Sequence, residues 1–281
     1  MEHWIINYES TIRLSCFITL FILMAILQMR YPRRLRNQNS ENTSQSMFGM
    51  RWLNNLSLVF AASILTRILL PITLVGFAFY CQKSGWGLFN QEYLTSINSG
   101  FIFIVSLILF DLIIYWQHRI FHYVPLLWRL HKVHHSDQDF DVSTGIRFHP
   151  LEILLSIAIK FSVVFIFGLT AESIITFEVI LNGLALFNHS NVKIPLKFDH
   201  YLRKIFVTPD MHRVHHSQIP KETNSNFGFN ISCWDRLFGS YIAQPNLGHD
   251  NMEIGLREYN GTDQPRKLTK LLSMPFTSSK D

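Results

Sequence analysis

Long apolar runs constrain this chain more than any other feature, because they exceed the helices of an ordinary soluble core. The runs fall near residues 11–29, 56–80, 97–116 and 151–187. About twenty apolar residues suffice to cross a bilayer as a helix. Hydrophobic residues make up 48% of the 281 positions and charged residues only 16%, an unusual balance for a soluble domain. We therefore predict an all-α integral membrane bundle.

Two of the four runs carry interruptions that predict breaks in the helix. Arg67 and Pro71 fall inside the second run, where we expect a kinked span. A segment that lies in the interface up to Arg67 is the alternative. The fourth run is too long for one crossing, and GLTAES around Gly168 is expected to turn it into a helical hairpin. The bundle then has about four spans, of which the last is a hairpin.

The orientation follows from RYPRRLR, which comes directly after the first run. Arginines beside a span mark the cytoplasmic side, so the polar loop at 37–50 is expected there. Two further crossings, through a short far-side loop at 81–96, bring residue 117 back to that side. We predict a cytosolic cap of short helices from residues 117–150 and 188–245, completing one domain over 1–245. A polar surface tail follows at 246–281, and the membrane is a bacterial inner membrane or the endoplasmic reticulum.

Three histidine clusters lie in the predicted cap. One has the pattern HxxxH and two have the pattern HxxHH, and residues three and four apart share one face of a helix. The clustered residues are His118, His122, His131, His134, His135, His212, His215 and His216. Eight imidazoles exceed the roughly four to six ligands of one first-row metal ion. We predict a two-metal site, with solvated surface histidines as the alternative.

Several other site types lack their sequence signals. No CxxC and no Glu-x-x-His motif occurs, so neither a structural zinc site nor a ferritin-type di-iron site is indicated. Cys16, Cys81 and Cys233 lie far apart, which gives no disulfide framework. The net charge of +5 is not arranged as a basic stripe with interleaved aromatic residues, so we expect no nucleic-acid partner. The N-terminus lacks the basic segment of a cleaved signal peptide.

These motifs resemble the fatty acid hydroxylase superfamily, which includes sterol desaturases, C-4 methylsterol oxidases and alkylglycerol monooxygenases. DLIIYWQHRIFH, LWRLHKVHHSDQDFDVSTGIRFHPLE, LFNHSNVKIP, TPDMHRVHHS and NFGFNISCWDRLFGSY all look like that family, over about residues 50–245. The resemblance implies two Fe²⁺ ions and O₂ as co-substrate, although zinc can fill such a site in a purified sample. It also implies that His189, in NHSN, is a ninth ligand; a helix cap is the alternative.

The implied activity is O₂-dependent hydroxylation of an unactivated C–H bond in a fatty acyl, sterol or related lipid, with desaturation as the alternative within the family. The chain shows no cytochrome b5 module and no GxGxxG, so electrons are expected from a separate cytochrome b5- or ferredoxin-type donor with its reductase. A non-redox metal-binding protein or transporter is disfavoured because the clusters lie outside the apolar runs. A metal-dependent hydrolase is disfavoured because the clusters lack carboxylates.

Metal-bound imidazoles need hydrogen-bond partners that orient them. Our candidates, each of which fits a merely structural role as well, are His149, Asp111 and Asn191, with Arg119 and Asp137. The histidines without a ligand-spaced partner, which we expect on the surface, are His3, His200 and His249. The tryptophans expected in the interfacial belt or the core of the cap are Trp116, Trp128 and Trp234.

Overall fold

The computed structural model describes residues 2–35, 49–94 and 96–277, with side chains from residue 7 onward. Within these ranges every regular element is a helix, and pairing between extended segments is limited to isolated bridges. Five stretches are long and apolar enough to cross a membrane: Asn7–Arg30, Met50–Lys83, Ser99–Tyr123, Pro150–Phe167 and Ala171–Asn188. The last two are the arms of the predicted hairpin. The prediction of an all-α membrane bundle is confirmed.

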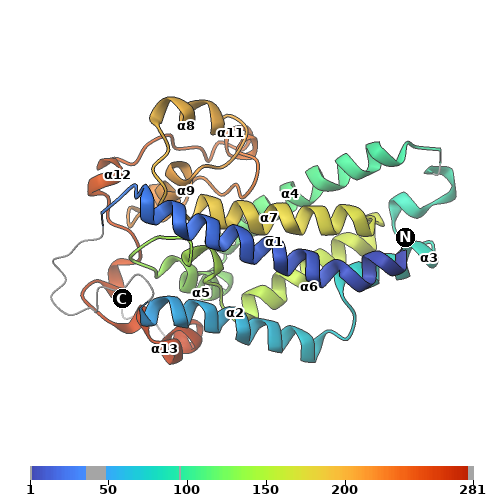
Figure 1. The fold of residues 1–281 in the computed structure, drawn as a ribbon, viewed down its shortest axis with the longest axis horizontal. Coiled ribbons are helices and arrows are strands. Elements are labelled where there is room, and N and C mark those ends of the chain that lie inside the picture. The colour runs from blue at the N-terminus through green and yellow to red at the C-terminus, as the bar shows by residue number, and fades with distance from the viewer. Residues whose placement is uncertain (1, 36–48, 95, 278–281) are drawn as a thin grey trace.

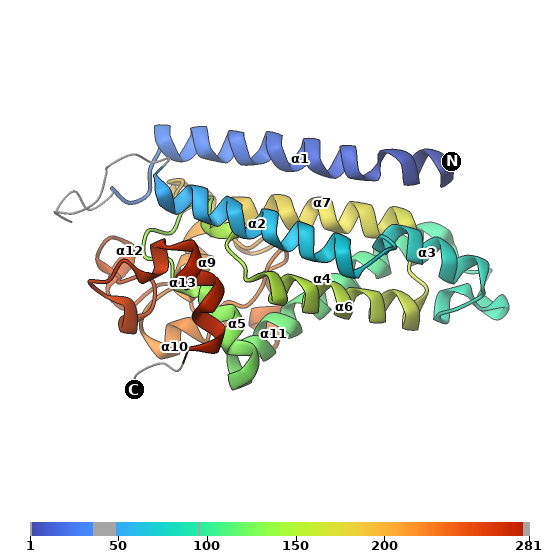
Figure 2. The same ribbon diagram turned by 90° about the horizontal axis from the view of Figure 1, so that it is seen from below.

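The long helices run alongside one another, and the short helices gather at one end of them (Figures 1 and 2). The long helices are α1 (Glu2–Arg30), α2 (Met50–Leu69), α4 (Ser99–Tyr123), α6 (Pro150–Phe167) and α7 (Ala171–Asn188), with α3 (Leu74–Lys83) continuing α2. The ends of α1, α4 and α7 and the starts of α2 and α6 all meet the short helices. The cap segments therefore lie at one end of the spans, as the prediction of a single cap requires. Most of the predicted loop at 37–50 lies outside the described residues.

Two local signals produce the breaks in the apolar runs. Pro71 lies between α2 and α3, and the side chain of Thr73 caps α3 by accepting from the Gly76 amide at 3.0 Å. Gly168 ends α6 in the left-handed region, at φ 69°, where a glycine is favoured. The predicted hairpin turn is confirmed, and the helix breaks at Pro71 as a kinked span requires.

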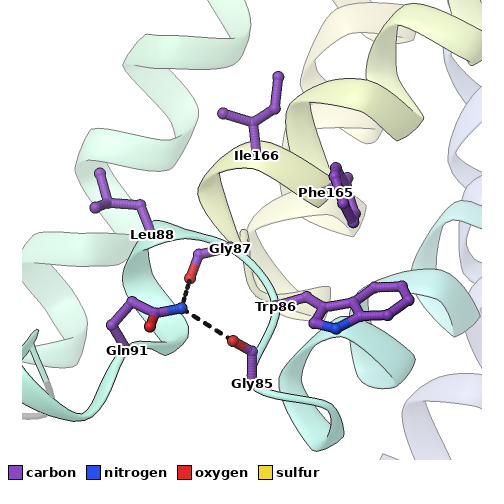
Figure 3. Close-up of a pocket in the computed structure, with 7 residues that line it drawn as sticks. All are labelled: Gly85, Trp86, Gly87, Leu88, Gln91, Phe165 and Ile166. Atoms are coloured by element: carbon purple, nitrogen blue, oxygen red, sulfur yellow. Dashed lines mark hydrogen bonds between the residues drawn. The ribbon is translucent and has the colours of Figure 1, made fainter.

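The loop after α3 covers the hairpin turn at the far end of the bundle. A β-carbon on Gly87 would stand 2.2 Å from the amide nitrogen of Gly168, so only glycine allows the two backbones to approach this closely. The Gln91 amide donates to the carbonyls of Gly85 and Gly87 at 3.0 Å each, and Trp86 packs edge-on against Phe165 (Figure 3). The pocket here contains no histidine and no carboxylate among its lining residues.

The cap is built from α5 (Pro125–His135), α8 (Leu196–Leu202), α9 (Pro209–His215), α10 (Pro220–Thr223), α11 (Cys233–Leu237), α12 (Gly248–Asn251) and α13 (Leu268–Ser273), with short 3₁₀ turns. Proline opens α5, α9 and α10, at the position where its missing N–H is not needed by the helix. In α9 the Thr208 hydroxyl also accepts from the Met211 amide. These start signals set where the histidines of α5 and α9 fall.

The segment expected to be a polar surface tail packs into the cap instead. Within the described residues its buried apolar side chains include Met252, Ile254, Tyr259, Leu271 and Met274. Three of them join one apolar cluster with Leu58 of α2 and Val133 of α5. The tail is sparse in apolar residues along the sequence, and only the fold brings these together against α2 and α5. The expectation of a surface segment was therefore wrong for this part of the tail.

Candidate metal centre

Four helices bring all nine predicted ligand residues to one place in the cap. His118 and His122 occupy the last turns of α4, and His189 caps the end of α7. The first HxxHH motif ends α5 and the second ends α9. The four helix ends lie together where the spans meet the cap (Figures 1 and 2). The predicted convergence of these residues is therefore present in the structure.

The nine imidazoles form two groups, and within each group the facing atoms all lie within 4.8 Å of one another. The five-histidine group is His118, His122, His131, His135 and His215. The four-histidine group is His134, His189, His212 and His216. Each HxxHH motif divides between the groups, because its residues at i and i+4 point one way and its residue at i+3 points to the neighbouring group. The two groups are therefore adjacent, with His135 and His216 stacked at 4.5 Å between ring centroids.

Backbone carbonyls fix the orientation of three rings. Nδ1 of His118 donates to the Phe227 carbonyl, Nδ1 of His215 to the Ser225 carbonyl, and Nδ1 of His189 to the Ala185 carbonyl, each at 2.7 Å. A carbonyl oxygen can only accept, so Nδ1 must carry the proton. In the neutral ring, Nε2 is then left with a lone pair that faces the group.

The unpaired nitrogens converge as a metal site requires. In the five-histidine group every Nε2 atom is buried and has no hydrogen-bond partner among the described residues. In the four-histidine group the Nε2 atoms of His134 and His212 lie 3.1 and 2.9 Å from that of His189. Buried polar atoms are rarely left unpaired, and a bound cation would satisfy these lone pairs. The donor set fits metal ions held by imidazole alone.

Burial favours the neutral form of six of the clustered histidines. Desolvation, followed by repulsion from neighbouring imidazoles, holds the pKa well below 6.5 for His134, His135, His212, His215 and His216. Burial also lowers the pKa of His189 to about 4. A neutral imidazole is the form that binds metal. The electrostatics and the geometry therefore favour the same state of the site.

The candidate orienting residues occupy other places in the structure. His149 accepts from the Leu151 amide and so caps α6, Asp111 accepts from the Trp234 indole at 2.7 Å, and Asn191 bonds the backbone of Arg34. No hydrogen bond in the described part joins any of the three to a clustered histidine. Arg119 donates to Tyr115, and Asp137 pairs with Arg51. These residues hold helices and loops together, and the expectation that they orient imidazoles is not supported.

Glu152, which was not among the residues predicted from the sequence, is placed to orient the imidazole of His131. Its Oε1 accepts from Nδ1 of His131 at 2.6 Å, and both side chains are buried. The only signal was its place in the first turn after His149, where an acidic residue also suits the helix dipole. This partner cannot be recognised from spacing, because it is brought to its histidine by the tertiary fold.

The isolated histidines are distributed differently from the prediction. His200 is exposed, as expected. His249, expected on the surface, is only 4% exposed and lies 3.6 Å from a carboxylate oxygen of Asp210. Burial lowers the pKa of His249 to about 4. The side chain of His3 lies outside the described part of the chain.

A buried charged network supports the helix that carries the first HxxHH. The guanidinium of Arg147 donates to the Val133 carbonyl at 2.9 Å, to Asn55 at 3.0 Å, to Ser136 at 2.8 Å and to the Pro265 carbonyl at 2.6 Å. Burial lowers the pKa of Arg147 to about 10. Arg147 therefore joins the end of α5 to α2 and to the segment before α13.

Asp137 completes this network just beyond α5. Burial alone would raise the pKa of its carboxyl, but Arg51, at 2.6 Å, and Arg147 hold it at about 2. Arg51 also pairs with Asp141, and Asp137 accepts from the Thr144 hydroxyl. The loop between α5 and α6 is thereby held against the start of α2.

A membrane helical bundle whose cap holds two adjacent polyhistidine groups defines a class of membrane proteins able to bind metal ions. The fatty acid hydroxylase family model matches residues 103–240, which contain all nine histidines. The chain therefore carries a fatty acid hydroxylase domain over these residues, which are just under half of its length. This confirms the resemblance recognised in the sequence.

Similarity to individual proteins is moderate. The chain is 32% identical over 150 residues to the ornithine lipid hydroxylase OlsE of Rhizobium tropici, covering 52% of this chain and 43% of that protein. It is 31% identical over 171 residues to the alkylglycerol monooxygenase of Homo sapiens, covering 55% and 33%. It is 26% identical over 217 residues to the human lathosterol oxidase, covering 76% and 64%. The matched region thus spans less than two thirds of each relative, and no solved structure matches the chain.

Proposed function

We propose that this protein is a membrane-bound di-iron hydroxylase that acts on a lipid. The observation that carries the proposal is that nine imidazoles form two adjacent groups where the candidate spans meet the cap. Balanced over one turnover, a C–H bond and O₂ consume two electrons and two protons and give an alcohol and water. When bound, two iron ions supply the reduction of dioxygen and the oxidising power that an unactivated C–H bond requires.

The division into five and four ligands supports two ions rather than one. Imidazole suits iron, zinc, copper and nickel, so the donor type alone does not select iron. The fatty acid hydroxylase domain favours iron among them. Neither group contains a carboxylate that could act as the general base of a hydrolase. The protein's part is to keep the imidazoles neutral, oriented and close together.

Aromatic side chains wall the two groups and exclude water. Phe148 stacks on His134 with 4.4 Å between ring centroids, and Phe140 lies edge-on to His216 at 4.9 Å. Phe227 and Phe229 cover His118 at 5.6 and 5.0 Å. A water-poor site protects a reactive oxidant and its substrate from side reactions. These aromatic walls therefore suit oxidation better than hydrolysis.

The position of the site supports a lipid substrate taken from the bilayer, with electrons delivered from the cytosol. The two groups lie where apolar spans end, and the related proteins are named for ornithine lipid, alkylglycerol and lathosterol. Arg30 ends α1 on the side of the cap, and Arg33 and Arg34 follow it, which favours a cytosolic cap. The electron donor is then a cytochrome b5- or ferredoxin-type protein with its reductase.

The test uses the full chain in lipid nanodiscs, loaded with ferrous iron and supplied with a reduced donor and a lipid extract. We expect about two iron atoms per chain and a lipid product whose new oxygen comes from ¹⁸O₂. Oxygen from water would favour a hydrolase, and a new double bond would favour a desaturase. His134→Ala and His215→Ala should lose both metal and product, whereas His200→Ala, on the exposed surface, should lose neither. Full activity in His134→Ala would overturn the site assignment.

A further inference from the structure

One of the nine clustered histidines reaches the surface. His122 is half-buried, whereas the other eight are at most 3% exposed. It lies at the end of α4, one residue before the exposed Tyr123. The four-histidine group is fully enclosed. Among the ligand candidates, the outer side of His122 is therefore where a molecule from outside can first meet the site.

Trp128 stands over this side of His122. Its ring centroid lies 4.9 Å from that of His122 and 5.3 Å from that of His135. Trp128 is itself half-buried, so one part of the indole contacts the five-histidine group and another part reaches the surface. Phe227 covers His122 from within the cap at 5.1 Å and is fully buried. The indole is therefore the part of this wall that borders the outside.

The turn between α4 and α5 presents apolar side chains to the outside. Tyr123, Val124 and Leu126 are 58%, 41% and 70% exposed, and Pro125, within this turn at residues 123–126, starts α5. Figure 2 shows α5, in green, doubling back from the end of α4. Exposed apolar side chains directly beyond the end of a candidate span are suited to lipid rather than to water.

The exposed turn continues the outer face of a span. Ile104, Ile108, Trp116 and Ile120 are exposed on α4, which is itself a candidate membrane span. The guanidinium of Arg119 lies over the rings of Trp116 and Tyr123, at 5.3 and 5.9 Å from their centroids. Trp, Tyr and Arg are the residues that gather at the boundary between acyl chains and headgroups. The lipid-facing surface of α4 thus leads directly to His122 and Trp128.

We propose that the 123–126 turn rests in the acyl region of the cap-side leaflet, and that a lipid acyl chain reaches the five-histidine group past the indole of Trp128. The inference rests on the proposed function, since it supposes that a lipid is the substrate. Trp128 is then a positioning residue, because its bulk limits how the chain approaches His122. Removing the indole should change the preference between lipid substrates, while the metal content and the reduction of the metal centre change little.

Contact with lipid can be tested without measuring activity. The photocrosslinking residue p-benzoylphenylalanine replaces Leu126, and separately Glu253, which is exposed beyond α12. The protein is placed in phosphatidylcholine nanodiscs that contain an alkyne-tagged oleoyl chain. We expect tagged lipid at position 126 at least tenfold above position 253. Equal, background labelling at both positions would overturn the proposal even if the wild-type protein hydroxylates lipids. If the wild-type protein hydroxylates no lipid, the proposed function is instead rejected.

The role of Trp128 is tested by Trp128→Ala and Trp128→Phe, with metal content measured first. For two lipids of different acyl length or branching, Trp128→Ala should change the ratio of their kcat/KM values several-fold, and Trp128→Phe should change it less. In both variants, the rates at which the donor protein and dithionite reduce the metal centre should equal those of the wild type. An unchanged lipid ratio with slow reduction by the donor alone would overturn the proposal and make Trp128 part of the electron path. Lipid capture at position 126 still tests the surface if Trp128→Ala fails to fold.

Discussion

Glu152 Oε1 lies 2.6 Å from Nδ1 of His131, although the two residues belong to different helices. Glu152 sits in the first turn of α6, a membrane span, and His131 is in α5 of the cap. The contact leaves Nε2 of His131 facing the five-histidine group without another partner among the described residues. A carboxylate behind a ligand imidazole fixes the ring and raises its basicity. The span and the metal centre are thereby connected through one buried hydrogen bond.

We predict that Glu152→Gln weakens metal retention by about 10- to 100-fold, the usual effect of losing such a partner. The amide keeps the size of the side chain but carries no charge, so any loss reports on the carboxylate. Iron content after dialysis against graded chelator measures the effect, with Glu253→Gln as the exposed control. Wild-type retention in Glu152→Gln would mean that the bond positions helices without tuning the ligand.

The parts of this protein that could be predicted from sequence are those set by neighbouring residues. The apolar runs, the kink at Pro71 and the turn at Gly168 each follow from a few consecutive positions. The histidine patterns also work locally, because spacing of three and four fixes a face of a helix. That the faces of α4, α5 and α9 turn toward one another was inferred from the number of imidazoles, not from any single segment.

The parts that could not be predicted depend on contacts between distant segments. Glu152, Arg147 and the buried tail residue Met274 have no recognisable spacing to the residues that they meet. His249 shows the same limit, since it is buried against Asp210 by the fold of the tail. His149, Asp111 and Asn191 lie near the clusters in sequence, yet their hydrogen bonds go to other groups. Closeness in sequence says little about which side chain stands behind an imidazole.

We predict that the metal-free protein loses stability as the pH falls from about 6.5 towards 4. The pKa of His189 is about 4 in the folded protein, against 6.5 when unfolded. Between these values the unfolded chain binds more protons, so the free energy of unfolding rises with pH. For His189 alone the difference corresponds to about 3 kcal/mol. Its full contribution is present above pH 6.5 and is lost as the pH approaches 4.

Thermal unfolding of the metal-free protein between pH 4 and 8 measures this dependence. Iron loading should reduce it near neutral pH, because metal and protons compete for the same lone pairs. His200→Ala, at the exposed surface, should leave the pH profile unchanged. A flat profile between pH 4 and 6.5 in the metal-free wild type would show that the imidazoles are accessible to water.

Arg147→Met should destabilise the cap by about 3 kcal/mol or more, because several buried oxygen acceptors lose their donor at once. These include the carbonyls of Val133 and Pro265. The same substitution should release metal, since Val133 lies between His131 and His134, which we propose as ligands on α5. Thermal midpoint and iron content measure the two effects, and Arg257→Met, at an exposed site, is the control. Lower stability with unchanged metal content would separate the fold of the tail from the geometry of the ligands.

The charged group between the spans gives the last prediction. Glu178 of α7 is buried, and its carboxylate lies 3.1 Å from Lys160 of α6 and 2.8 Å from Arg13 of α1. In Glu178→Gln two cations would share a low-dielectric environment without a counter-charge, and breaking a buried ion pair in this way costs about 3–5 kcal/mol. We therefore expect lower thermal stability in nanodiscs, while Glu172→Gln, at the exposed start of α7, has little effect. Adding Lys160→Met to Glu178→Gln should restore part of the loss, because it removes one of the unpaired cations. If the double variant is no more stable than the single one, Glu178 acts through Arg13 and holds α1 against α7.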